Sequence, residues 1–333
     1  MYLGKQWLFL FIGIFIGACA VFLFFFFSSS KEKVLSPSRE LVQENSKYPH
    51  IRPLILPWDQ KLNRTQELFP FRNVIDASIA KLVQEKKVEV VAYYFRDLNN
   101  GPYFGINIDQ SFSLASLLKV PVLMSYYRWA EQDPSILKKK LVFYESNVKR
   151  IDENPLTKPK TRLQPGETYI VEDLIEKMIT ESDNDSFQLL VENIDVGLLA
   201  DPYNLTESEI DSKDDDYSGS LRRYSTFLRA IYNASYLSRP YSEKAMQVLA
   251  RSEFKEGIVA GLPKGIEVAH KFGVRESKDT HQLHDCGVVY YPNNPYLICI
   301  MTKGKDIRDL SSVIKQLSIL TYKEVNTQLA RKE

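Results

Sequence analysis

The longest apolar stretch of the chain lies close to its N-terminus. Residues 7–27 read WLFLFIGIFIGACAVFLFFFF and include no charged side chain. As a helix rising 1.5 Å per residue, this stretch spans about 31 Å, close to the thickness of the hydrocarbon core of a bilayer. The pattern predicts a transmembrane helix over residues 7–27, preceded by a short stub over residues 1–6. The alternatives are a cleaved signal peptide, for which the stretch is long, and acylation at Cys19, beyond which the apolar residues continue.

The segment after this stretch has no regular hydrophobic period. Residues 28–70 are rich in Ser, Pro and charged side chains, a composition that is typical of a linker. Within the linker, we expect Ile55, Leu56 and Trp58 to dock on the folded domain. The folded domain itself is then expected over residues 71–333.

Helical and strand periods follow one another in this domain. Residues 71–87 predict a helix, and the β-branched and aromatic segments 88–97 and 103–108 predict a β-hairpin. Residues 117–250 have mostly helical periodicity. The apolar face expected for the first helix consists of Val74, Ile75, Ile79, Leu82 and Val83. Three further strands and a closing helix are predicted at residues 268–274, 287–291, 296–302 and 307–317.

This order of elements predicts an α+β fold. Because strands occur at both ends of the domain, we expect an antiparallel sheet formed by both chain ends, with helices on its faces and a mostly helical subdomain. The composition agrees with a packed core, since 44% of the 333 residues are hydrophobic. The 43 Lys and Arg against 42 Asp and Glu give a net charge of +1, which argues against a disordered chain and against nucleic acid as a partner.

Cysteines and histidines give no pattern of a metal site. Only three cysteines are present, too few for a disulfide scaffold: Cys19, Cys286 and Cys299. The last two face each other across the final hairpin, where we expect free thiols because cross-strand neighbours rarely meet disulfide geometry. The remaining alternative is a metal site near Asp285, with His270, His281 and His284 as its ligands. The spacing of these residues does not match a metal-binding motif, so no metal and no cofactor are predicted.

A serine and a lysine one helical turn apart form the first candidate site. Ser116-Leu117-Leu118-Lys119 opens an apolar helix after a strand-like stretch, so the two polar side chains share a face. A desolvated lysine can activate a serine hydroxyl as a nucleophile, and free N–H groups at a helix start can bind an oxyanion. The S-x-x-K spacing also occurs elsewhere in the chain, for example at Ser28, Ser135 and Ser312. Position, rather than spacing, therefore distinguishes Ser116.

Two further motifs follow along the chain. Ser182-Asp183-Asn184 begins 66 residues after Ser116, and Lys271-Phe272-Gly273 begins 89 residues after Ser182. Alone, the first is also typical of a helix cap and the second of a charge on an edge strand. In this order, S-x-x-K, S-D-N and K-x-G resemble the penicillin-recognising serine hydrolases, most closely the class A β-lactamases. The resemblance covers about residues 71–329.

The resemblance implies catalytic roles for three side chains. Ser116 is expected to be the acylated nucleophile, Lys119 its activating base, and Ser182 the relay that passes a proton to the leaving nitrogen. Lys271 would supply positive charge beside Ser182. Two neighbouring lysines depress each other's pKa, which favours a neutral amine that can accept a proton.

The resemblance also implies a set of substrate contacts. Asn184 would hold the side-chain amide of the substrate, and Lys271 would lie near its carboxylate. The oxyanion hole would consist of the backbone N–H groups of Ser116 and of Val274, just past Gly273.

Several positions depart from the class A pattern. Phe272 stands where the family has a hydroxyl residue for the substrate carboxylate, and Arg275 is the candidate to replace that contact. Gln188 stands where the family has Asn. No Glu-x-x-x-Asn lies between the second and third motifs, and the nearest match is Glu207 with Asp211. Glu207 is therefore the candidate deacylating base, and the alternative is an acidic solvated loop.

Together these observations predict a serine hydrolase of the class A β-lactamase type, acting on β-lactams or a related amide through an acyl-Ser116 intermediate. Two alternatives stay open: a D-Ala-D-Ala carboxypeptidase or transpeptidase similar to the penicillin-binding proteins, and a non-catalytic cell-envelope binding module. The expected partners are a small-molecule β-lactam or a peptidoglycan-like peptide, and the membrane. Because such substrates are met outside the cytoplasmic membrane, the resemblance implies an extracytoplasmic domain and a cytoplasmic stub at residues 1–6.

Overall fold

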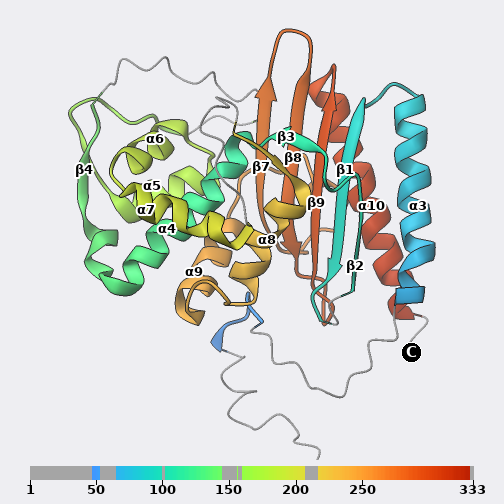
Figure 1. The fold of residues 1–333 in the computed structure, drawn as a ribbon, viewed down its shortest axis with the longest axis horizontal. Helices are drawn as coiled ribbons and strands as arrows, with labels where there is room; N and C mark the ends of the chain where they lie inside the picture. Colours follow the sequence, from blue (N-terminus) through green and yellow to red (C-terminus); the bar gives the residue numbers. More distant parts are fainter. Residues whose placement is uncertain are drawn as a thin grey trace, which may run out of the picture. The chain divides into compact units, whose positions relative to one another are not determined.

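A five-stranded antiparallel sheet organises the described part of the chain (Figure 1). This computed structural model describes residues 47–52, 65–99, 102–144, 156, 160–206 and 217–330. The predicted transmembrane helix, Cys19, the expected docking residues of the linker and Glu207 lie outside these ranges. Within these ranges, no helix combines the length and the apolar character needed to cross a membrane.

The sheet combines strands from both ends of the domain. Its order is β2-β1-β9-β8-β7, and every neighbouring pair is antiparallel. The predicted sheet is thereby confirmed. The strands are β1 (Val90–Asp97), β2 (Tyr103–Ile106), β7 (Val268–Glu276), β8 (His281–Val289) and β9 (Tyr296–Gly304).

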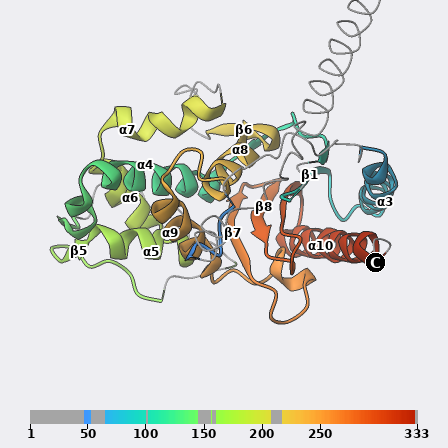
Figure 2. The same ribbon diagram turned by 90° about the horizontal axis from the view of Figure 1, so that it is seen from below.

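Helices cover both faces of this sheet, which is why its central strands read as continuous apolar runs. In Figures 1 and 2, α3 (Thr65–Gln84) and α10 (Ile307–Ala330) lie on one face, and the other helices lie on the opposite side. A separate hydrophobic cluster fills each side of the sheet. The interface between the sheet and the second group of helices holds the candidate site described below.

The helical subdomain is built from short elements between β2 and β7. Two small antiparallel ladders tie it together, β3 with β6 and β4 with β5. Its helices are α4 (Lys119–Gln132), α5 (Val171–Thr180), α6 (Asn184–Glu192), α7 (Val196–Ala200), α8 (Leu221–Tyr232) and α9 (Arg239–Ala250). Its short strands are β3 (Ser111–Ser113), β4 (Lys140–Val142), β5 (Thr168–Ile170) and β6 (Ser218–Ser220). Among the described residues, the 3₁₀ helices are η1 (Ala115–Leu118), η2 (Pro134–Lys138), η3 (Asp201–Thr206) and η4 (Val259–Gly261).

The structure corrects the expected helix at the start of the domain. Helix α3 begins at Thr65, inside the segment that the sequence predicts to be linker. Val74 and Val83, expected on its apolar face, are exposed. The buried face instead follows a spacing of four, four and three residues, which is the period of one helical stripe, through Phe71, Ile75, Ile79 and Leu82.

The structure also moves the start of β8. The strand begins at His281, six residues before the predicted start, although its first residues are polar. These residues pair with β7 on one side and β9 on the other. Pairing on both edges outweighs their weak intrinsic strand propensity.

The expectation of free thiols at Cys286 and Cys299 is wrong. The two residues are directly opposed on β8 and β9, with Cα atoms 4.0 Å apart, and they form a disulfide. Directly opposed side chains point to the same face of a sheet, and both of these are fully buried. The register therefore brings the two side chains together in the core.

Candidate active site

The three sequence motifs meet between the helical subdomain and the sheet. Ser116 lies in η1 and Lys119 is the first residue of α4. Ser182 lies in the connection from α5 to α6, and Lys271 lies on β7. Residues far apart in the sequence are thus joined by direct side-chain contacts, as the motif order predicts.

The backbone is strained at two of these motifs. Ala115, next to the nucleophile candidate, has φ +46°, and Ser182 has φ +58°. Non-glycine residues rarely adopt this left-handed region, and those that do cluster at active sites because the surrounding structure fixes them. These two kinks aim the hydroxyls of Ser116 and Ser182 at a common amine, that of Lys119.

Gly273 allows β7 to approach the turn that carries Ser116. A Cβ atom at Gly273 would lie 2.9 Å from the carbonyl oxygen of Leu114 and 3.2 Å from the backbone nitrogen of Leu117. Any side chain would therefore push the strand away from η1. This close approach requires the glycine of the third motif. Val274, the next residue of β7, lies beside it.

The Lys119 amine is the centre of the site. Its Nζ lies 2.6 Å from the carbonyl oxygen of Ser182 and 2.7 Å from Oδ1 of Asn184, both of which can only accept. It also lies 3.0 Å from Oγ of Ser116 and 3.1 Å from Oγ of Ser182. A neutral amine donates its two hydrogens to the first pair of oxygens and keeps a lone pair for the hydroxyls.

Burial favours this neutral form. Lys119 is 1% exposed, and desolvation lowers its pKa from 10.5 to about 7, while the charge of Asp183 opposes the shift. At neutral pH a large fraction of the amine is therefore free to accept a proton from Ser116. The predicted pair of nucleophile and base has the geometry and the proton affinity that its chemistry needs.

The Lys271 amine completes a chain of polar groups through Ser182. Its Nζ donates to Oγ of Ser182 at 2.9 Å and to the carbonyl oxygen of Phe272 at 3.0 Å. Burial lowers the pKa of Lys271 well below its usual value, the charge of Lys119 lowers it further, and Asp285 opposes both. Oγ of Ser182 thus lies between two amines, a position that suits a proton relay.

Phe272 places an aromatic ring beside the Lys271 amine, where the family pattern has a hydroxyl residue. Its ring is fully buried and stacks on Phe254, with ring centroids 4.2 Å apart and an interplanar angle of 21°. The Nζ of Lys271 lies 4.1 Å from the centre of the Phe272 ring. The face of the aromatic ring therefore lies against the Lys271 amine, and its quadrupole attracts the charged form of the amine.

The other predicted site residues are only in part joined to this centre. Asn184 contacts Lys119 directly, whereas Arg275 lies exposed farther along β7. Gln188 donates from Nε2 to Oε1 of Glu192 at 2.8 Å on α6. The role expected for Glu207 stays a prediction, because this residue is outside the described ranges.

Asp183 has a structural role in addition to its charge. It is the N-cap of α6 and accepts a hydrogen bond from the backbone N–H of Ser186 at 2.9 Å and another from the Ser186 hydroxyl. The capping role that the sequence allowed for S-D-N is confirmed for this residue. One carboxylate both starts the helix and sets the electrostatic environment of Lys119.

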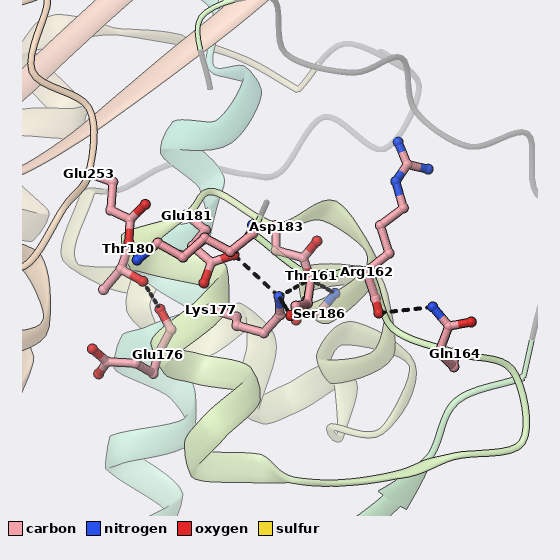
Figure 3. A network of polar contacts seen from close by, with 11 residues as sticks. Thr161, Arg162, Gln164, Glu176, Lys177, Thr180, Glu181, Asp183, Ser186 and Glu253 are labelled. Carbon is pink, nitrogen blue, oxygen red and sulfur yellow. Dashed lines mark hydrogen bonds and ion pairs between the residues drawn. The ribbon is translucent and has the colours of Figure 1, made fainter. Parts of the chain in front are cut away.

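A polar network holds the end of α5 just before the second motif (Figure 3). Lys177 donates to the carbonyl oxygen of Thr161 and to Oε2 of Glu181, the latter at 3.2 Å. The same carboxylate oxygen accepts the backbone N–H of Lys160 at 2.9 Å, and the backbone N–H of Glu253 donates to Thr180 at 2.9 Å. No sequence motif predicts this network, because it consists of single polar contacts between separate segments of the chain.

A buried histidine supports the strand that precedes Ser116. His284 donates from Nε2 to the carbonyl oxygen of Ser113 at 3.0 Å and accepts the backbone N–H of Thr302 at Nδ1 over 3.3 Å. Burial lowers its pKa to about 4, which matches a neutral ring with one donor and one acceptor. His284 is thus a structural histidine in this site.

The other two histidines of the metal-site alternative do not join it. His270 pairs with Asp285 over 2.8 Å on the far face of β7 and β8, and His281 lies near Glu276 at 3.8 Å. Among the described residues, no three metal-ligating side chains come together.

Comparisons with known proteins agree with this geometry. Residues 74–325 match a family model described as the beta-lactamase enzyme family. No curated protein sequence matches the chain significantly. Among solved structures, PBP-A is similar at 24% identity with a TM-score of 0.63, over 78% of this chain and 97% of PBP-A.

Two further similar structures are of beta-lactamases. A beta lactamase from Xanthomonas campestris has 15% identity and a TM-score of 0.66, over 77% of this chain and 98% of its own. A class A beta-lactamase from Mycobacterium abscessus has 18% identity and a TM-score of 0.65, over 76% of this chain and 99% of its own. These likenesses establish a shared fold over nearly the whole length of the relatives.

Proposed function

Because the chain belongs to the beta-lactamase enzyme family, we propose that it opens β-lactams or a related amide through an ester on Ser116. The observation that carries this proposal is the position of the Lys119 amine. Its Nζ lies 3.0 Å from Oγ of Ser116 and can donate its hydrogens to two other oxygens, the carbonyl oxygen of Ser182 and Oδ1 of Asn184. No cofactor takes part in this chemistry. A binding module would need neither the buried lysines nor their contacts with Ser182.

The acylation step follows from these contacts. The lone pair of Lys119 takes the proton of Ser116 as Oγ attacks the carbonyl carbon of the substrate. The carbon–nitrogen bond then breaks, and the leaving nitrogen receives a proton from Oγ of Ser182. Ser182 is resupplied by the amine of Lys119 or of Lys271, 3.1 Å and 2.9 Å away. Water later hydrolyses the ester and regenerates the serine.

We assign the substrate contacts on the same basis. The backbone N–H groups of Ser116 and Val274 form the oxyanion hole, which the close approach at Gly273 makes possible. Lys271 and the exposed Arg275 provide positive charge for the substrate carboxylate, and Asn184 binds the substrate amide beside Lys119.

Time-resolved intact-mass analysis tests the proposal. The full chain in detergent is mixed with a penicillin or a cephalosporin, and both the protein adduct and the remaining drug are followed. We expect an adduct in the wild type and none in Ser116→Ala. Ser312→Ala is the matched control, because Ser312 and Lys315 repeat the S-x-x-K spacing on α10, and it should react like the wild type. Equal adduct formation in Ser116→Ala would refute the assignment.

The second candidate is a penicillin-binding peptidase in which the ester persists. The missing Glu-x-x-x-Asn pattern favours it, as does the similarity to PBP-A, a mutant of which is described as an acyl-enzyme complex with penicillin G. The same experiment separates the two. An adduct that decays with continued consumption of drug identifies a β-lactamase and directs attention to Glu207, whereas a stable adduct and turnover of a muropeptide identify a peptidase.

We further propose that residues 7–27 anchor the chain in a membrane and that the domain faces the extracytoplasmic side. The apolar stretch supports the anchor, and the Cys286–Cys299 disulfide supports an oxidising compartment. Protease added to intact spheroplasts that express the full chain should degrade the domain. Protection of the domain until the membrane is opened would contradict this orientation.

A further inference from the structure

A short segment ahead of the domain is packed against both the helical subdomain and the sheet side of the domain. We call residues 48–52 the strap. Ile51 is 5% exposed and belongs to the hydrophobic cluster of the helical side. In Figure 2 the strap lies between α9 and β7. Nothing in the proposed reaction uses this segment, although it is built with specific polar contacts.

His50 provides most of these contacts. Its Nδ1 lies 2.5 Å from Oε1 of Glu243 on α9, and its backbone N–H donates to Oε2 of the same carboxylate at 2.9 Å. Its Nε2 lies 3.3 Å from Oε1 of Glu267, the residue before β7. Tyr290, just after β8, donates its hydroxyl to the carbonyl oxygen of His50 at 3.0 Å, with the two rings edge to face.

Both ring nitrogens of His50 face carboxylate oxygens, which only accept hydrogen bonds. The ring therefore bridges a buried glutamate of the helical subdomain and a glutamate just before the sheet strand β7. Glu243 is 7% exposed and Glu267 is 53% exposed, so the first pair is the better shielded of the two.

The rest of the strap reinforces the same bridge. The backbone N–H of Arg52 donates to the carbonyl oxygen of Tyr232, the last residue of α8, at 2.9 Å. The Arg52 guanidinium donates to Oδ1 of Asn99 in the connection between β1 and β2. The titratable and charged groups around His50 are therefore Glu243, Glu267, Tyr290, Tyr232 and Arg52.

The bridged elements are those that carry the active site. Helix α9 packs against α4, which begins with Lys119, and against α5, which leads to Ser182. Strand β7 packs against α9 and against η1, and it carries Lys271 four residues after Glu267. A clamp between α9 and the start of β7 thus acts on the distance between the two amines that share Ser182.

We propose that His50 is a positioning residue that clamps α9 to β7 and so holds Lys119 and Ser182 within reach of Lys271. This inference rests on the proposed acylation of Ser116 for its kinetic readout. Misplacement of catalytic groups by a fraction of an ångström to 1 Å lowers rates by about ten- to a hundredfold. His50→Ala should therefore lower the acylation rate constant about tenfold, while the affinity for unreacted penicillin stays unchanged.

The experiment uses the full chain in detergent and stopped-flow acylation by a fluorescent penicillin, which separates affinity from the acylation rate constant. Val325→Ala, on α10 in the other hydrophobic cluster, is the matched control for loss of stability. His50→Arg is the conservative variant, because a guanidinium keeps its charge and can donate to both glutamates. We expect His50→Arg to retain the wild-type acylation rate constant, whereas His50→Ala loses about tenfold.

Hydrogen exchange of the unacylated chain gives an independent readout. We expect faster exchange in residues 268–274 and 182–186 of His50→Ala than in Val325→Ala at equal stability. Equal exchange in the two variants, or an acylation rate constant of His50→Ala equal to that of the wild type, would overturn the inference. If the wild type forms no adduct, the proposed function fails, and the exchange comparison alone decides the role of His50.

Discussion

Acylation should depend on the protonation of one buried amine, that of Lys119. An ordinary lysine with a pKa near 10.5 is neutral in only about one molecule in 3000 at pH 7. Burial lowers the pKa of Lys119 from 10.5 to about 7, which corresponds to about 5 kcal/mol of penalty on its charged form. At pH 7 about half of the molecules then hold the neutral base.

The acylation rate constant should follow this neutral fraction. From pH 6 to pH 7 it should rise about fivefold, and from pH 7 to pH 9 only about twofold. Asp183→Asn provides the test of the cause. The Asp183 charge raises the pKa of Lys119, and an asparagine keeps an oxygen for the N-cap of α6. In this variant the midpoint of the pH profile should move below that of the wild type.

Stopped-flow acylation between pH 5.5 and about pH 10.5 measures both profiles, and circular dichroism at each pH confirms that the chain stays folded. A wild-type rate that rises only near pH 10, or does not change with pH, would refute Lys119 as the neutral base. A midpoint in Asp183→Asn above the wild-type value would refute the electrostatic role of Asp183.

Three further predictions concern the support of the site. The pKa of His284 is about 4 in the fold, against 6.5 ordinarily, so the unfolded chain takes up the proton at a higher pH than the folded chain. The free energy of unfolding should therefore fall by about 3 kcal/mol as the pH drops from 6.5 to 4. Denaturant titration should show a smaller fall in His284→Gln. Gly273→Ala places a methyl group 2.9 Å from the carbonyl oxygen of Leu114 and should lower acylation at least about tenfold with little loss of fold; unchanged kinetics would contradict the close approach. Ala115→Gly relieves a positive φ and should raise the free energy of unfolding by about 1 kcal/mol in the same titration, whereas destabilisation would argue against strain.

The sequence predicts the sheet well, because its strands are apolar on both faces. Residues 296–302 and 88–97 combine β-branched and aromatic residues that only a doubly covered sheet can bury. The start of β8 at His281 does not follow this pattern, because its polar residues are held in the sheet by pairing with β7 and β9. Local periodicity carries no record of such pairing.

The disulfide shows a second limit of sequence patterns. The position of Cys286 and Cys299 around the last turn predicts that they face each other, which is confirmed. Whether opposed cysteines form a disulfide depends on the distance between their Cα atoms, here 4.0 Å, and the sequence pattern does not give this distance. The sequence therefore predicts the contact and misses the bond.

The centre of the site is predictable because its residues form short motifs. Spacing and resemblance predict four residues of this centre, and their side chains are in contact: Ser116, Lys119, Ser182 and Lys271. The supports are not predictable in this way. His284 and His50 act through single long-range contacts with Ser113 and Glu243, and such contacts leave no local pattern.

The most direct test of the account is to locate the acyl group. The full chain is treated with a penicillin, quenched in acid within its acylation time and digested, and the modified peptide is sequenced by mass spectrometry. We predict a penicilloyl group on Ser116 and its loss in Lys119→Met, which removes the base but keeps the volume of the side chain. A penicilloyl group on another residue, or undiminished modification of Ser116 in Lys119→Met, would contradict it.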